Sequence, residues 1–347
     1  MKNLFHGISA ILILMIMVCL LAGCATASGG GDTATEMEVM TETAESGLLK
    51  IRFFEVKNSD ASSWGDSTYI EFPDGRNMII DFGGSGAGAE IAGYLKAEGI
   101  TYIDYAVFSH CHSDHVNGFT DFLNAGIGFG HAMTNDYIPT NYAWMAARFS
   151  ANGMDTTVLN AGYSFDIGEV HFTVLSPFPE DLDYANLGRT NAADSGTGSN
   201  RDINDSSIVL KMTYGDFSAL FTGDIYTDQE ARILDAYRDN PEILDVDVMK
   251  LMHHGKDTSG SSEWIAATSP KLAVAEGLFS VSASKCMEYL DAGASDIYFT
   301  WMNGNVYVTS DGNGFEYHAD RPEMTGSYKG LRALYEYKKA QQEAENK

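Results

Sequence analysis

SHCHSDH, at residues 109–115, is the most informative segment of this chain, and it directly follows an apolar run typical of a buried strand. His110 and His112 can turn the same way on an extended loop and chelate one metal ion. Asp114 and His115 lie beyond a turn and can address a second ion. Imidazoles and carboxylates together suit Zn²⁺, or Mn²⁺ and Fe where oxygen ligands are more numerous. The segment therefore predicts a metal site at the end of a strand.

Two later segments carry residues of the same chemical kind at predicted strand ends. LFTGD, at 220–224, ends on Asp224, whose carboxylate can give one oxygen to each of two cations. LMHHGKDTSGSS, at 251–262, contains His253 and His254. Either histidine can be the ligand, and the other can face the substrate as an acid or a hydrogen-bond donor.

The order of these motifs resembles the metallo-β-lactamase superfamily over residues 50–318. The resemblance implies an α/β fold, a four-layer αββα sandwich, which the alternation of strands and helices in two halves also favours. It implies metal ligation by a set of histidines and aspartates: His110, His112, Asp114, His115, Asp224 and the pair His253 and His254. It further implies that Asp81, in IIDFG at 79–83, holds the histidine loop in place.

Further motifs indicate which group within the superfamily this chain resembles, and one position differs from the pattern of many members. The HHG motif and NDSSIVL, at 204–210, are similar to the hydrolase domain of the bacterial DNA-uptake channel ComEC and its secreted relatives, and the phosphorylcholine esterase of teichoic acids has a similar HHG arrangement. Many members carry a further histidine just before the NDSSIVL strand, where this chain has Asn204 or Asp205. His131 and His171 lie in the preceding interval without that setting, and we expect His171 on the outer face of its strand.

The resemblance implies an extracellular metal-dependent hydrolase with two divalent metal ions, most readily Zn; Mn or Fe, or a single metal, remain alternatives. We expect a phosphodiesterase that acts on nucleic acid or cell-envelope phosphodiesters by metal-activated hydroxide. Asp114 would orient the nucleophile, and His254 or His253 would protonate the leaving oxygen. The alternatives are a hydrolase of another ester or lactone class, and a non-catalytic envelope-binding protein that keeps the fold.

The composition limits the partners. The chain has 347 residues, with 48 acidic against 22 basic side chains and a formal net charge of −26, and no cluster of Lys and Arg occurs. Such a surface repels polyanions at long range, so we expect no strong nucleic-acid-binding patch. An acidic protein can still process a phosphodiester substrate if metal ions supply the local positive charge.

The N-terminal segment predicts secretion. A short apolar run ends in the sequence LAGC, which resembles a bacterial lipoprotein signal and makes Cys24 the lipidation site; an uncleaved anchor or an ordinary signal peptide are the alternatives. We expect a signal peptide at 1–23, a flexible acidic tether at 24–47, the hydrolase domain at 48–320 and a helical tail at 321–347. The protein would then be extracytoplasmic and anchored to the cell membrane by its lipid.

Sequence periodicity predicts the elements of the domain. The expected strands are 51–56, 67–72, 77–81, 102–109, 156–160, 170–176, 206–214, 217–223, 245–252, 271–277, 297–301, 305–310 and 314–318. The expected helices are 89–99, 119–126, 142–153, 227–240 and 261–269, with a long polar loop at 177–205. Cys111 alternates away from His110 and His112, so we expect it to pack in the core rather than to bind metal or form a disulfide.

Overall fold

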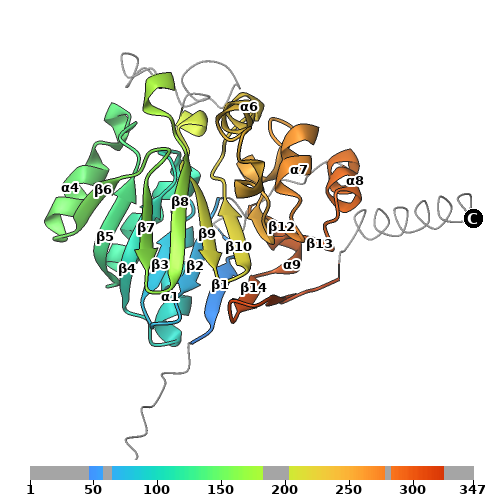
Figure 1. Cartoon of the computed structure of the whole chain (residues 1–347). Helices are drawn as coiled ribbons and strands as arrows, with labels where there is room; N and C mark the ends of the chain where they lie inside the picture. Colours follow the sequence, from blue (N-terminus) through green and yellow to red (C-terminus); the bar gives the residue numbers. More distant parts are fainter. Residues whose placement is uncertain (1–46, 58–64, 183–202, 278–282, 324–347) are drawn as a thin grey trace, which may run out of the picture. The chain divides into compact units, whose positions relative to one another are not determined.

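Two sheets and the helices on their outer faces make up the part of the chain described by this computed structural model, which covers residues 47–57, 65–182, 203–277 and 283–323 (Figure 1). All of these residues belong to one unit, residues 45–347. The expected signal peptide, Cys24 and the tether lie outside the described residues, as do most of the long loop and of the C-terminal tail.

The first sheet combines antiparallel and parallel pairs. Its strands are β1 (Leu49–Phe53), β2 (Thr68–Glu71), β3 (Asn77–Ile80), β4 (Tyr102–Phe108), β5 (Gly128–Thr134), β6 (Asp155–Val158), β14 (Val306–Ser310) and β15 (Phe315–Ala319). They run in the order β15-β14-β1-β2-β3-β4-β5-β6. The pairs from β3 to β6 are parallel, and the others are antiparallel. The parallel strands β3 and β4 therefore end at the same edge of the sheet.

The second sheet has the same mixed character. Its strands are β7 (Ser164–Ile167), β8 (Val170–Ser176), β9 (Val209–Tyr214), β10 (Phe217–Phe221), β11 (Val248–Lys250), β12 (Leu272–Ala275) and β13 (Asp296–Phe299), in the order β13-β12-β11-β10-β9-β8-β7. Strands β10 to β13 are parallel, and β7 to β10 are antiparallel. The carboxyl ends of β10, β11 and β12 thus share one edge.

Helices cover the outer face of each sheet. They are α1 (Ala87–Ala97), α3 (Phe119–Asn124) and α4 (Trp144–Ala151) on the first sheet, and α6 (Thr227–Ala236), α7 (Ser262–Thr268) and α8 (Ala283–Asp291) on the second. One apolar cluster fills the space between the sheets, and two others fill the spaces between each sheet and its helices. These three apolar interfaces define four layers, so the predicted αββα sandwich is confirmed.

The sequence pattern located most elements but missed several short ones. β5 was not expected, since the glycines of GFGHAMT weaken its strand signal, and β7 was not expected because it is short and half exposed. The helix α8 was also missed, as were two short helices, α2 (Ser113–Val116) and α9 (Thr300–Asn303). Among the described residues, no helix is long and apolar enough to cross a membrane.

Candidate metal centre

The polar residues singled out in the sequence converge where strands of both sheets end. β4 leads into His110, β10 into Asp224 and β11 into the short 3-10 helix η5 (Met252–Gly255), which carries the histidine pair. The two sheets are joined here, because Ile208 N donates a hydrogen bond to Ser109 O across 2.9 Å. Carboxyl ends of parallel strands commonly place functional loops together, which explains how segments more than 100 residues apart meet.

Asp224 lies at the centre of this arrangement. Its Oδ2 atom is 3.2 Å from His115 Nε2, 3.3 Å from His254 Nε2 and 3.9 Å from His110 Nε2. Its backbone N–H donates to Ser207 Oγ at 3.0 Å, which fixes the loop that carries it. The same carboxylate oxygen therefore faces three imidazoles, whereas the sequence suggested one oxygen for each cation.

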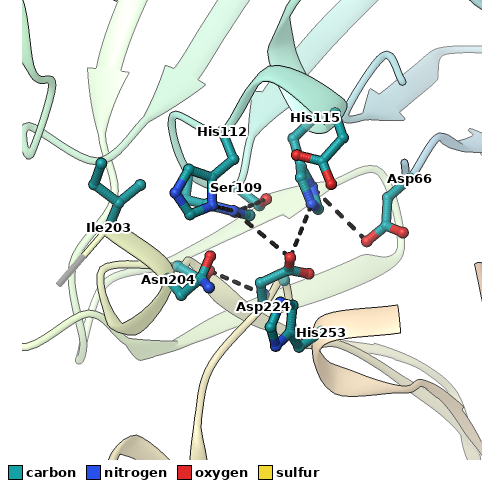
Figure 2. A network of polar contacts seen from close by, with 12 residues as sticks. Asp66, Ser109, His112, His115, Ile203, Asn204, Asp224 and His253 are labelled. Carbon is teal, nitrogen blue, oxygen red and sulfur yellow. Dashed lines mark hydrogen bonds and ion pairs between the residues drawn. The ribbon is translucent and has the colours of Figure 1, made fainter. Parts of the chain in front are cut away.

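Two metal positions can be distinguished around Asp224. On one side, His110 Nε2 and His112 Nδ1 are 3.1 Å apart, a separation that suits two ligands of one ion. On the other side, His254 Nε2 is 3.1 Å from Asp114 Oδ2. Figure 2 shows His112 and His115 on opposite sides of the space above Asp224. We call the position beside His110 and His112 the first position, and the one beside Asp114, His115 and His254 the second.

Carboxylates behind the rings set which nitrogen faces the centre. His115 Nδ1 lies 2.7 Å from Asp81 Oδ2, and Asp81 also accepts hydrogen bonds from Ser109 N at 2.8 Å and Ser109 Oγ at 2.5 Å. His254 Nδ1 lies 2.9 Å from Asp66 Oδ1. A histidine that donates through Nδ1 presents the lone pair of Nε2, and both Nε2 atoms face Asp224.

Asp66 is a residue of the centre that the sequence analysis missed. Asp66, His115, Asp224 and His254 each offer one ligand-type atom, and these atoms all lie within 4.8 Å of one another, so the four could hold a metal ion. However, Asp66 lies on the Nδ1 side of both rings, 2.9 Å from His254 and 3.8 Å from His115. This location suits a residue that orients the ligands better than a ligand itself.

Two more buried ionisable residues, Lys250 and Glu276, lie next to the centre. Lys250 Nζ forms an ion pair with Asp66, lies 3.3 Å from Asp224 Oδ1 and donates to Gly223 O at 2.7 Å. Glu276 accepts from Ser67 N at 3.1 Å, and burial, reinforced by Asp66, raises its pKa to about 8. Lys250 therefore holds the Oδ1 side of Asp224 and leaves Oδ2 for the metal positions.

The sequence does contain a weak signal for these three residues. Lys250 and Glu276 are the single charges in the apolar runs VMKLM, at 248–252, and LAVAEG, at 272–277, and Asp66 precedes the strand STYIEF. An isolated charge in a buried strand needs a partner of opposite charge, because burial without one is costly. Pairing them, however, requires the strand order, which periodicity does not give.

The electrostatics of the second position favour a cation. Burial lowers the pKa of His115, but Asp224, Asp81 and Asp66 raise it well above its usual value. Burial likewise lowers the pKa of His254, and Asp224 and Asp66 outweigh that effect. These carboxylates attract any cation, so a metal ion competes with protons for the two rings, and its binding must release protons.

The first position behaves differently. Burial lowers the pKa of His110 well below its usual value, with His115 acting in the same direction, and burial also lowers the pKa of His112. Both rings are therefore neutral at pH 7 and already in the protonation state that binds metal. His110 is buried, whereas His112 is half buried, so the solvent reaches the centre on the His112 side.

The two histidines of the HHG motif have different surroundings. His254 faces Asp114 and Asp224, as described above. His253 places Nδ1 2.6 Å from Thr258 Oγ1 and Nε2 3.0 Å from Lys256 Nζ, and its ring lies 4.9 Å from that of Tyr226. The geometry thus favours His254 as the ligand and locates His253 beside the centre, with both ring nitrogens engaged by neighbours.

The backbone at the centre is held in uncommon conformations. Asp81, His253 and His254 have φ values of 60°, 45° and 56°, in the left-handed region that non-glycine residues rarely adopt. Gly65, with φ of 103°, brings Asp66 against the histidine loop, because a Cβ atom at this glycine would lie 2.0 Å from Asp114 O. Such strain is typical of functional sites that the surrounding fold keeps rigid.

Asn204 and Asp205 occupy the place where many relatives have a histidine, and they point to different neighbours. Asn204 is buried, and its Nδ2 donates to Tyr226 Oη at 2.8 Å. Asp205 Oδ1 instead accepts from Tyr226 N at 3.0 Å, just before α6. The Asn204 side chain also interacts with His112.

The remaining sequence candidates lie elsewhere. His171 is exposed and contacts Asp166 at 2.6 Å, in agreement with the outer face expected for it, and His131 Nε2 is 2.7 Å from Thr157 Oγ1. Cys111 is buried with Sγ 3.8 Å from Met145 Sδ, and it forms no disulfide within the described ranges. Burial raises its pKa to about 12, so packing is its role, as expected.

Comparison with known proteins agrees with this geometry. A sequence model of the metallo-beta-lactamase superfamily matches residues 65–271, which is more than half of the chain. The chain belongs to the metallo-beta-lactamase superfamily. The matched range contains the histidine loop, Asp224 and the HHG motif, and the family indicates a metal-dependent hydrolase that uses divalent metals.

Two curated relatives are competence proteins. The chain is 26% identical over 250 residues to ComE operon protein 3 of Bacillus subtilis, covering 65% of this chain and 28% of that protein. It is 27% identical over 201 residues to competence protein ComA of Neisseria gonorrhoeae, covering 58% of this chain and 24% of that protein. The chain thus spans about a quarter of the length of these relatives, and the expected resemblance to the ComEC group is confirmed.

Solved structures of the same fold are more distant in sequence. The metallo-beta-lactamase fold protein YhfI of Bacillus subtilis has a TM-score of 0.48 at 12% identity, covering 76% of this chain and 100% of that one. A diphosphatase of the PhnP family has a TM-score of 0.40 at 13% identity, covering 73% of this chain and 86% of that one.

Proposed function

We propose that this protein is a phosphodiesterase whose centre holds two divalent metal ions, one on each side of Asp224. The observation that supports this most is that Asp224 Oδ2 faces His110, His115 and His254 at 3.2 to 3.9 Å. A carboxylate shared by two histidine sets is the arrangement expected of a two-metal hydrolase.

The donor groups fit such ions. The second position offers two Nε2 atoms and the carboxylates of Asp114 and Asp224, which match the N and O ligands of Zn²⁺. The first position offers His110 Nε2 and His112 Nδ1, both neutral at pH 7. When bound, divalent ions lower the pKa of water towards neutrality and offset negative charge on phosphoryl oxygens.

The residues of the chain have distinct tasks in this proposal. Asp81 and Asp66 orient His115 and His254 through their Nδ1 atoms. Asp114, whose side chain is 12% exposed, is the most accessible carboxylate of the set and would orient the attacking water. His253, held beside the centre by Thr258 and Lys256, would protonate the leaving oxygen.

The substrate class rests on the centre and on the charge of the chain. A phosphodiester carries one negative charge, which the metal ions and the partly exposed Lys256 beside His253 can balance. The net charge of −26 disfavours long DNA, so short nucleic acid or an envelope phosphodiester is the better substrate. We also propose that the chain is extracytoplasmic and joined to the membrane through a lipid on Cys24, on the basis of its LAGC motif.

An activity panel tests the reaction class. Bis-p-nitrophenyl phosphate, p-nitrophenyl phosphorylcholine, a lactone and nitrocefin are incubated with the metal-loaded protein and with an Asp224→Ala variant. We expect a phosphodiester to be hydrolysed at least about 100-fold faster by the unmodified protein. Asp216→Ala, in the exposed β9–β10 turn, is the matched control and should keep full activity.

Other results of the activity panel would point to a different function. If no phosphodiester is hydrolysed faster than by Asp224→Ala, the phosphodiesterase proposal is wrong; turnover of the lactone or nitrocefin alone would identify another hydrolase class. A protein without bound transition metal and without activity would instead be a binding protein, an alternative that the replacement of a ligand histidine by Asn204 keeps open.

A further inference from the structure

Asn204 has a buried amide that is only half satisfied. The residue lies in a helical turn at 203–205, directly before β9, and is 1% exposed. Its Nδ2 donates to Tyr226 Oη at 2.8 Å, whereas its Oδ1, although near His112, accepts no hydrogen bond of normal geometry from the described residues. A buried carbonyl oxygen without a partner is costly, so such an atom indicates a place for a donor or a cation.

The position of that oxygen points to the first metal position. Because the amide nitrogen is bound to Tyr226, the oxygen is turned to the opposite side, and Figure 2 shows it directed towards His112 beside Asp224. The Asn204 side chain also interacts with the His112 ring, so the two side chains are neighbours. His112 Nδ1 in turn is 3.1 Å from His110 Nε2. The oxygen thus lies close to the pair of nitrogens that forms the first position.

The local structure holds the asparagine in this place. Ser207 N donates to Asn204 O at 2.9 Å, and Ser207 Oγ accepts from Asp224 N at 3.0 Å. The turn that carries Asn204 is therefore connected to the loop that carries the shared carboxylate. The neighbouring Asp205 has a different contact, because its Oδ1 accepts a hydrogen bond from Tyr226 N at 3.0 Å.

We propose that Asn204 Oδ1 is a ligand of the metal ion at the first position. This inference rests on the proposed two-metal function and deepens it. The first position then has two imidazole nitrogens, one amide oxygen and one carboxylate oxygen, while Tyr226 orients the amide. Oxygen ligands suit Mn²⁺ and Fe better than a third imidazole does, so this donor set shifts the preference of the first position away from Zn²⁺.

Metal binding, measured without reference to activity, tests this assignment. The unmodified chain, Asn204→Leu and Asn204→His are stripped of metal, titrated separately with Mn²⁺ and Zn²⁺ by calorimetry, and analysed for bound metal after dialysis. We expect two ions per chain in the unmodified protein. Asn204→Leu should keep one ion at unchanged affinity and bind the other at least about 10-fold more weakly. Asn204→His should raise the Zn²⁺ affinity of that position relative to Mn²⁺.

Control variants distinguish an error in the Asn204 assignment from an error in the two-metal proposal. Asn160→Leu, in the turn between β6 and β7, is matched because the Oδ1 of Asn160 also accepts no hydrogen bond, and it should bind metal as the unmodified chain does. Two ions bound with unchanged affinity by Asn204→Leu would overturn the ligand assignment alone. Fewer than two ions in the unmodified protein would overturn the two-metal proposal itself. If Asn204→Leu does not fold, an unchanged Zn²⁺-to-Mn²⁺ affinity ratio in Asn204→His overturns the assignment.

Discussion

The ion pair between Lys250 and Asp66 offers a quantitative test of how the centre is built. Lys250 is 3% exposed and Asp66 is 2% exposed, so replacing Lys250 by Met leaves a carboxylate in the interior without its cation. Breaking one partner of a buried pair typically costs about 3–5 kcal/mol. Asp66 keeps its 2.9 Å contact with His254 Nδ1, so we expect the lower end of this range, about 3 kcal/mol.

Urea unfolding in the presence of a chelator measures this loss without the contribution of bound metal. With a denaturant slope of about 3 kcal/mol per molar, the unfolding midpoint of Lys250→Met should fall by about 1 M. The double variant Asp66→Asn/Lys250→Met removes both charges and should be at least about 1 kcal/mol more stable than Lys250→Met. Lys271→Met, which breaks the exposed ion pair with Asp247, should cost less than about 1 kcal/mol.

Two results would refute this reasoning. One is a loss below about 1 kcal/mol in Lys250→Met, because the pair would then contribute no more than a surface ion pair. The other is a double variant that is no more stable than Lys250→Met. In that case the loss would come from the missing packing of the lysine chain and not from the unpaired Asp66.

Three further predictions address the surroundings of the centre. The pKa of Glu276 is raised to about 8, so the folded protein keeps a proton that the unfolded chain loses above about pH 4.5. As the pH rises between these values, Glu276 should lower the stability of the metal-free protein by up to about 1.4 kcal/mol per pH unit, and Glu276→Gln should make the decline in pH-dependent denaturation less steep, whereas an unchanged slope would contradict the raised pKa. Asp81→Asn should weaken metal binding at the second position about 10- to 100-fold in calorimetry, because His115 loses the carboxylate that orients it, and an unchanged affinity would argue against that role. Gly88→Ala should destabilise the fold, since the added Cβ would lie 2.2 Å from Gly118 O, and an unchanged melting temperature would contradict this.

Much of the fold and the centre could be predicted from the sequence, because the motifs lie at the ends of strands with clear periodicity. The histidine loop, Asp224 and the HHG motif are brought together as the motif order indicates. Which histidine of the pair faces Asp224 could not be predicted, since adjacent residues in a left-handed turn point in directions that only the backbone angles determine.

The missed residues have a common physical reason. Asp66, Lys250 and Glu276 become neighbours only through the strand order and the packing of one sheet on the other, and neither is encoded in a local pattern. The role of Asn204 is similar, because it depends on Tyr226, 22 positions later, taking the amide nitrogen. Short elements such as β5 and β7 escaped detection because glycine or exposure weakens their periodicity.

Anomalous X-ray diffraction from crystals of the Mn²⁺- or Zn²⁺-loaded protein tests the central claim most directly. Two anomalous peaks should flank Asp224 Oδ2, one beside His110 and His112 and the other beside His115 and His254. Two results would contradict the proposed two-metal centre. One is a peak next to Asp66, at the position of the Lys250 ammonium group, and the other is the absence of any peak among these histidines.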